Sequence, residues 1–155
     1  MRVGLGIDAH RFAPGRKLVL GGVEIPHETG LAGHSDADVV LHALMDAMLG
    51  ACGAGDIGEM FPDTDETYAG VASTELLGKV ALEMESRGFK LVNADIVVVC
   101  EEPRLSKHRE AIRARIAEVL GADPGSIAVK GTTTEGMGFT GRGEGIAAIA
   151  TVLIE

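Results

Sequence analysis

The fold is decided by the stretch Leu91-Val92-Asn93-Ala94-Asp95-Ile96-Val97-Val98-Val99-Cys100, whose β-branched second half is typical of a buried strand. A helix is expected before it, because Ser73 can cap an apolar run that ends near Gly88. A second helix is expected after it, from about Ser106 to Leu120, with one apolar face. A strand between two amphipathic helices indicates a chain that mixes sheet and helix.

The rest of the chain extends this alternation. A long apolar helix begins near Asp36 or Asp38, either of which can cap it, and ends between Gly50 and Gly55. Asp123-Pro124-Gly125 is expected to form a turn. Further strands are expected at about residues 2–8, 17–20, 23–25, 127–130 and 145–154, the second and third forming a hairpin around two glycines.

Three helices and about four main strands favour an α+β fold. We expect a two-layer sandwich with a mixed four-stranded sheet, helices packed on one face, and a small β-hairpin. The chain has 155 residues and 46% hydrophobic residues, with no repeat, linker or low-complexity segment. Residues 1–155 are therefore predicted to form a single catalytic domain.

Composition excludes several classes of partner. A formal net charge of −9, 3% aromatic residues and no Trp disfavour binding to nucleic acid or to anionic membranes. The longest apolar stretch is interrupted by His42 and Asp46, and no signal peptide is recognisable. Cys52 and Cys100 lie in apolar surroundings without metal-ligand spacing, which indicates reduced, buried thiols. We expect a cytoplasmic protein.

Asp8 and His10 are the first candidate metal ligands. They are two residues apart in a predicted strand, so their side chains project from the same face. His42, inside the apolar helix, is the natural third ligand, and Asp46 at i+4 is expected to orient its other ring nitrogen. Three ligands and one open position are typical of a catalytic zinc site. Taken singly, each residue is more often a cap or a solvated side chain.

The Gly/Thr loop, residues 131–145, is the second candidate site. Its glycines and threonines can bring backbone N–H groups and hydroxyls close to phosphate oxygens. Glu135 suits such a loop if a divalent cation lies between carboxylate and phosphates. The loop matches neither a Walker motif nor a dinucleotide-binding fingerprint. It therefore indicates either a diphosphate site with a metal or a flexible surface connection.

Seven blocks of the chain carry a resemblance to a known family. The blocks are residues 6–10, 21–26, 34–38, 41–44, 55–58, 61–65, and 132–135 with 138–145. Together they resemble the 2-C-methyl-D-erythritol 2,4-cyclodiphosphate synthase family of the non-mevalonate route to isoprenoids. They occur in family order and span nearly the whole sequence.

The resemblance implies a lyase that converts 4-diphosphocytidyl-2-C-methyl-D-erythritol 2-phosphate to the cyclic diphosphate and CMP. The 2-phosphate of the substrate attacks its own β-phosphorus, so no protein nucleophile is needed. Asp8, His10 and His42 match the zinc ligands, with a substrate phosphate at the open position. Glu135 matches the residue that holds a Mg²⁺ or Mn²⁺ bridging the diphosphate, and His34 and Thr133 match the catalytic stabilisers of the transition state.

The resemblance also implies substrate contacts and an assembly. Active sites would lie between the subunits of a homotrimer, and Phe139 and Arg142 would line an axial cavity for isoprenoid diphosphates. Arg104 stands where Lys is usual, and Ser106 where an apolar residue is common. The methylerythritol-phosphate contacts would be Ser35, Asp56, Ile57, Gly58, Phe61, Pro62, Asp63, Thr64 and Asp65. The cytidine and diphosphate contacts would be Cys100, Glu101, Glu102, Pro103, Arg104, Leu105, Ser106, Thr132, Thr133, Thr134 and Glu135.

Two other functions use part of the same residues. A zinc phosphohydrolase would use the three ligands to activate a water molecule, with His34 as general base. A non-catalytic trimer that binds isoprenoid diphosphates would need the region of Phe139 and Arg142 but not the metal ligands. Neither alternative accounts for all the blocks together.

Overall fold

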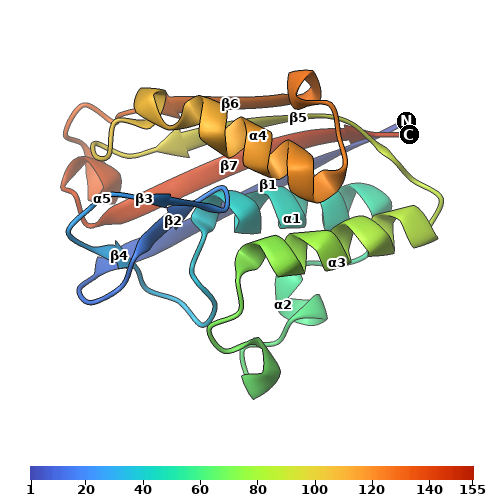
Figure 1. Ribbon diagram of the computed structural model, residues 1–155, viewed down its shortest axis with the longest axis horizontal. Helices are drawn as coiled ribbons and strands as arrows, with labels where there is room; N and C mark the ends of the chain where they lie inside the picture. Colours follow the sequence, from blue (N-terminus) through green and yellow to red (C-terminus); the bar gives the residue numbers. More distant parts are fainter.

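A mixed sheet forms one layer of the chain and three long helices form the other (Figure 1). The computed structural model describes residues 1–155. The sheet has the strand order β4-β1-β7-β5-β6, with β5 and β6 parallel and the other pairs antiparallel. Its strands are β1 (Arg2–Ala13), β4 (Gly30–Leu31), β5 (Leu91–Val99), β6 (Ile127–Thr132) and β7 (Gly145–Ile154).

This architecture confirms the α+β prediction, with two differences in the strands. The four long strands and the β2–β3 hairpin (Leu18–Leu20, Val23–Ile25) are as expected, and the two-residue β4 adds a fifth strand at the edge. β1 continues to Ala13, beyond the predicted end at Asp8, because it pairs with β7 as far as Arg11 and then with β4. Asp8 and His10 are therefore held inside a paired strand.

The three long helices lie on one face of the sheet (Figure 1). Of the two predicted caps of the first long helix, Asp38 is the one used. Its carboxylate accepts hydrogen bonds from the N–H groups of Val40 and Leu41 and also from those of Gly21 and Gly22 in the hairpin turn. The long helices are α1 (Val39–Cys52), α3 (Ser73–Ser86) and α4 (Arg109–Leu120). Short turns are α2 (Ile57–Met60), α5 (Gly138–Gly141), η1 (Glu66–Tyr68), η2 (Leu105–Lys107) and η3 (Pro124–Ser126).

Two glycines of β1 allow α1 to lie unusually close to the sheet. A Cβ atom at Gly4 would collide with the carbonyl oxygen of Ala47, and one at Gly6 with that of Ala43. Residues 4, 6, 8 and 10 project from the same face of the strand. The two inward positions that follow the glycines are therefore Asp8 and His10, beside α1.

The two faces of the sheet differ in burial. Alternate side chains of the central strands are buried under the helices, including Ile96 and Val98 of β5. On the opposite face Val97 and Val99 are only half-buried, so the predicted buried strand is covered on one side within the single chain. That face also exposes an apolar stripe made of Val3, Leu5, Ile7 and Ile149.

Both cysteines agree with the expectation of reduced thiols. Cys52 and Cys100 are buried and free. Burial also raises the pKa of the Cys100 thiol to about 11, so this side chain stays protonated. None of the helices has the length and apolar character needed to cross a membrane.

Candidate functional site

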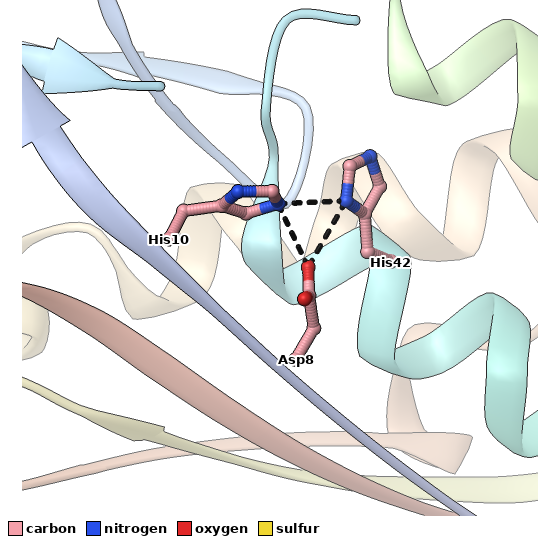
Figure 2. Close-up of side chains that lie close together, drawn as sticks. All are labelled: Asp8, His10 and His42. Atoms are coloured by element: carbon pink, nitrogen blue, oxygen red, sulfur yellow. Dashed lines mark hydrogen bonds and ion pairs between the residues drawn. The ribbon is translucent and has the colours of Figure 1, made fainter. Parts of the chain in front are cut away.

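Asp8, His10 and His42 form a compact triangle of ligand atoms, here called the metal triad (Figure 2). Asp8 Oδ2 lies 2.9 Å from His10 Nε2 and 3.0 Å from His42 Nδ1, and the two nitrogens are 3.0 Å apart. Ligands of a tetrahedral zinc ion with bonds of about 2.0 Å are separated by about 3.3 Å. The donor set and its spacing therefore fit a metal ion bound through three protein ligands.

The electrostatics of the metal triad favour a cation. Burial opposes ionisation of Asp8, but hydrogen bonds and charge attraction from the two imidazoles hold the pKa of its carboxyl well below the usual range. The pKa of His10 is raised, because the bond to Asp8 outweighs the effect of its burial. The carboxylate is thus ionised and already attracts positive charge to this position.

A cavity of about 420 Å³ opens beside the metal triad. It brings His10 and His42 together with predicted substrate contacts from three segments of the chain, and Met45, Tyr68 and Leu76 also line it although the sequence did not indicate them. Leu76 and Met45 appear in the sequence only as ordinary apolar helix residues. The predicted contacts that line the cavity are His34, Ser35, Ile57, Gly58, Phe61, Pro62 and Asp63. Asp56, Thr64 and Asp65 do not line it and are exposed.

Asp46 does not orient His42, so that prediction is wrong. Its Oδ1 atom accepts a hydrogen bond of 2.9 Å from the backbone N–H of Ile57, at the start of α2. The reason is the direction of the imidazole ring. Because Nδ1 of His42 faces Asp8 on β1, Nε2 points toward the N-terminus of α3 and not along α1.

Ser73 is not the cap of the following helix, which is a second correction. It is the first residue of α3, and the cap position, Ala72, has no side chain to accept a hydrogen bond. Asp36 takes this role from another segment, since its Oδ2 atom accepts from the Ser73 N–H at 3.0 Å. The Ser73 hydroxyl is fully buried and lies 3.2 Å from His42 Nε2.

A second hollow, here called the Cys100 pocket, has a volume of about 540 Å³. It contains most of the predicted cytidine and diphosphate contacts, but Glu102, Thr134 and Glu135 do not line it. It shares no lining residue with the cavity at the metal triad. Its lining is Cys100, Glu101, Pro103, Arg104, Leu105, Ser106, Arg109, Gly131, Thr132 and Thr133.

The Gly/Thr loop is partly ordered by the chain itself. Glu101 Oε1 accepts hydrogen bonds from the N–H groups of Thr134 and Gly136, at 3.1 and 3.4 Å. The Thr133 hydroxyl donates to Glu135 Oε1 at 2.9 Å, and both side chains belong to exposed residues. Glu101 therefore anchors the middle of the loop, while Thr133 and Glu135 contact each other and remain open to a ligand.

Phe139 and Arg142 do not share a cavity within the single chain. Phe139 borders a hollow of about 670 Å³ together with Arg11 and Phe12. Arg142 borders a different hollow of about 460 Å³, and its Nε atom donates to Glu144 at 2.6 Å. Phe12 borders both hollows, so the two lie next to each other.

Comparisons with known proteins agree with this arrangement. The whole chain, residues 1–155, matches the YgbB family. It is 56% identical over 154 residues to 2-C-methyl-D-erythritol 2,4-cyclodiphosphate synthase from Moorella thermoacetica, covering 99% of this chain and 94% of that protein. It is 57% identical to the bifunctional enzyme IspD/IspF from Desulforudis audaxviator, covering 98% of this chain but only 39% of that longer relative.

A solved structure shows the same fold. A 2-C-methyl-D-erythritol 2,4-cyclodiphosphate synthase in a CDP-bound form superposes with a TM-score of 0.91 at 38% identity, covering 99% of this chain and all of the other. The arrangement of strands and helices around the metal triad is thus that of a protein which has been seen with a cytidine nucleotide.

Proposed function

We infer the reaction of this chain from its family: the chain belongs to the YgbB family, and it is a lyase that makes 2-C-methyl-D-erythritol 2,4-cyclodiphosphate in the non-mevalonate pathway to isoprenoids. The observation that carries the inference is the metal triad, whose open side faces a cavity lined by His34, Ser35 and the segment from Ile57 to Asp63. That arrangement suits a phosphorylated substrate held at a cation.

The reaction is an intramolecular phosphoryl transfer. An oxygen of the 2-phosphate of 4-diphosphocytidyl-2-C-methyl-D-erythritol 2-phosphate forms a bond to the β-phosphorus. The bond between that phosphorus and the oxygen bridging to the α-phosphorus breaks, and CMP leaves with the electron pair. Both reacting groups belong to one substrate, so the protein acts by positioning them and by neutralising charge.

Asp8, His10 and His42 would hold Zn²⁺, and Glu135 would hold a Mg²⁺ or Mn²⁺ near the substrate diphosphate. When bound, these cations supply charge neutralisation at the phosphate oxygens and orient the β-phosphorus for attack. The support for the first site is the triangle of ligand atoms. The support for the second is the exposed carboxylate of Glu135 in a loop rich in backbone and hydroxyl donors.

His34 and Thr133 are proposed to stabilise the transition state from opposite sides. His34 lines the cavity at the metal triad, and its Nε2 atom lies 3.3 Å from the Asp65 carbonyl oxygen, which restrains the ring. Thr133 lines the Cys100 pocket, and its hydroxyl contacts Glu135. The methylerythritol phosphate would be bound near His34, and the cytidine and α-phosphate near Thr133.

A homotrimer with shared active sites is proposed, because one chain separates the two halves of the site. The cavity at the metal triad and the Cys100 pocket have no residue in common. The helix-free face of the sheet exposes Val3, Leu5 and Ile7, whose apolar side chains would be covered by neighbouring subunits. Assembly would also bury Val97 and Val99 of β5.

The remaining ligands follow from the same assembly. The Cys100 pocket would bind cytidine, with Arg104 keeping the positive charge at its position, and related proteins have been seen in CDP complexes. The adjoining hollows at Phe139 and Arg142 would meet near the trimer axis, where an isoprenoid diphosphate would bind.

One incubation tests the proposed reaction. Purified chain with the diphosphocytidyl substrate and Mg²⁺ should release CMP and a cyclic diphosphate in equal amounts, which ³¹P NMR distinguishes from simple phosphate esters. Release of inorganic phosphate or of a monophosphate without a cyclic product would favour the zinc phosphohydrolase. Binding of isoprenoid diphosphates to metal-free chain without any turnover would favour the non-catalytic module.

A further inference from the structure

A buried hydrogen-bond relay reaches His42 from the side opposite the metal triad. It is formed by Ser73, the first residue of α3, and by Asp36, which lies two residues before the cap of α1. We propose that Asp36 and Ser73 are positioning residues that fix the tautomer of His42 in which Nδ1 is free to bind the metal. The inference rests on the metal site of the proposed function and gives a positioning role to two residues that are not metal ligands.

The positions of the protons follow from a count of donors. The Asp36 carboxylate accepts two hydrogen bonds from Ser73, from its backbone N–H at 3.0 Å and from its hydroxyl at 2.5 Å. A carboxylate has no proton to return, so the single hydroxyl proton of Ser73 is used in the second bond. The Ser73 oxygen therefore faces His42 Nε2, 3.2 Å away, as an acceptor, and Nε2 must carry the proton.

Ser35 alone would not fix this tautomer. Its Oγ atom lies 3.1 Å from His42 Nε2 and accepts a hydrogen bond from the Ala37 N–H. Apart from Nε2 itself, the nearest acceptor for the Ser35 hydroxyl proton is Ser73 Oγ at 3.5 Å, and no carboxylate accepts it. A hydroxyl in that position can donate to Nε2 as readily as accept from it. Ser73 and Asp36 therefore fix the direction of the hydrogen bond at His42 Nε2.

The direction of the relay decides whether His42 can bind a metal. A neutral imidazole that carries its proton on Nε2 presents a lone pair at Nδ1, which is the atom facing Asp8 and His10. A ring with the proton on Nδ1 would donate it to Asp8 and could not act as a ligand. Groups that hold a metal-binding histidine in this way typically change metal affinity about 10–100-fold when removed.

The sharpest variant is Asp36→Asn. Asp36 Oδ1 also accepts the Asp38 N–H at 3.2 Å, but the Ser73 N–H lies closer to Oδ2, at 3.0 Å. The oxygen of the new amide is therefore expected at the Ser73 N–H, which turns its NH₂ group toward the Ser73 hydroxyl. That hydroxyl would then donate to His42 Nε2 and reverse the relay. We expect zinc to bind the full chain about 10–100-fold more weakly, measured by competition with a chromophoric chelator. Asp46→Asn is the matched control, because Asp46 is one helical turn from His42 but bonded to Ile57, and its zinc affinity should stay within about twofold.

A second pair of variants separates hydrogen bonding from packing. Ser73→Thr and Ser73→Val place side chains of the same shape in this buried position, and only Thr retains the hydroxyl. We expect Thr to bind zinc about 10–100-fold more tightly than Val. Circular dichroism of the metal-free proteins checks that both are folded, because Val leaves Asp36 and His42 Nε2 without the hydroxyl and should unfold at a lower temperature. The proposed relay would be refuted if Ser73→Thr and Ser73→Val bound zinc equally well. It would also be refuted if Asp36→Asn and Asp46→Asn had the same zinc affinity. A wild-type chain that takes up no zinc would instead overturn the metal assignment itself.

Discussion

The metal triad and the Gly/Thr loop, the two walls of the proposed active site, differ in how much of their geometry one chain fixes. The side chain of His42 is only 11% exposed, and both of its ring nitrogens have partners from other elements. Thr133 and Glu135 are exposed and contact each other. The geometry of the first wall is fixed within one chain, whereas in the proposed assembly the second would be completed by a ligand and a neighbouring subunit.

The largest effect is expected from substitutions in the metal triad. His42→Ala or Asp8→Ala should abolish zinc loading and activity, because either change removes one of only three protein ligands. The fold should largely persist, since the metal joins elements that already pack through the core of β1 and α1. Elemental analysis with circular dichroism gives the answer, and full zinc occupancy in both variants would contradict the assignment.

Complementation tests whether the two walls belong to different subunits. His42→Ala and Thr133→Ala chains, each inactive alone, should recover activity when mixed under conditions that allow subunit exchange. With equal mixing about a quarter of the interfaces pair the intact half of each chain, so recovery should approach about a quarter of wild-type activity. Sizing should show a trimer. A fully active monomer, or no recovery despite demonstrated exchange, would refute the shared site.

A smaller effect, confined to the Gly/Thr loop, is expected for Glu135→Gln. The variant should need about tenfold more Mg²⁺ for half-maximal activity, because it loses the carboxylate proposed to hold that cation. Zinc content should be unchanged, since Glu135 lies outside the metal triad. Titration of activity with Mg²⁺ at fixed zinc measures the shift, and a parallel loss of zinc would show that the two walls are not independent.

The smallest effect is expected for Asp46→Ala. Asp46 contacts the N–H of Ile57 and not His42, so zinc affinity should remain within about twofold of wild type. Loss of one hydrogen bond at the start of α2 should lower the free energy of unfolding by about 1 kcal/mol. Chelator competition and thermal unfolding separate the two quantities, and a tenfold loss of zinc affinity would restore Asp46 as a partner of His42.

The sequence alone determined the layers of the fold and the identity of the triad. Periodicity and β-branched residues identified the four long strands and three long helices, because these are local properties of the chain. The two-residue spacing of Asp8 and His10, and the burial of an imidazole in an apolar helix, indicated three ligands that the structure brings within 3.0 Å of one another.

Only the tertiary structure decided what lies behind the ligands. Spacing along one helix favoured Asp46 as the partner of His42, but the direction of the ring is set by β1, which Gly6 allows to approach α1. Ser73 looked like an ordinary helix cap, and only the packing of α3 brings its hydroxyl and Asp36 to Nε2. Such contacts join residues 31 and 37 positions apart in the chain, a separation that no local pattern records.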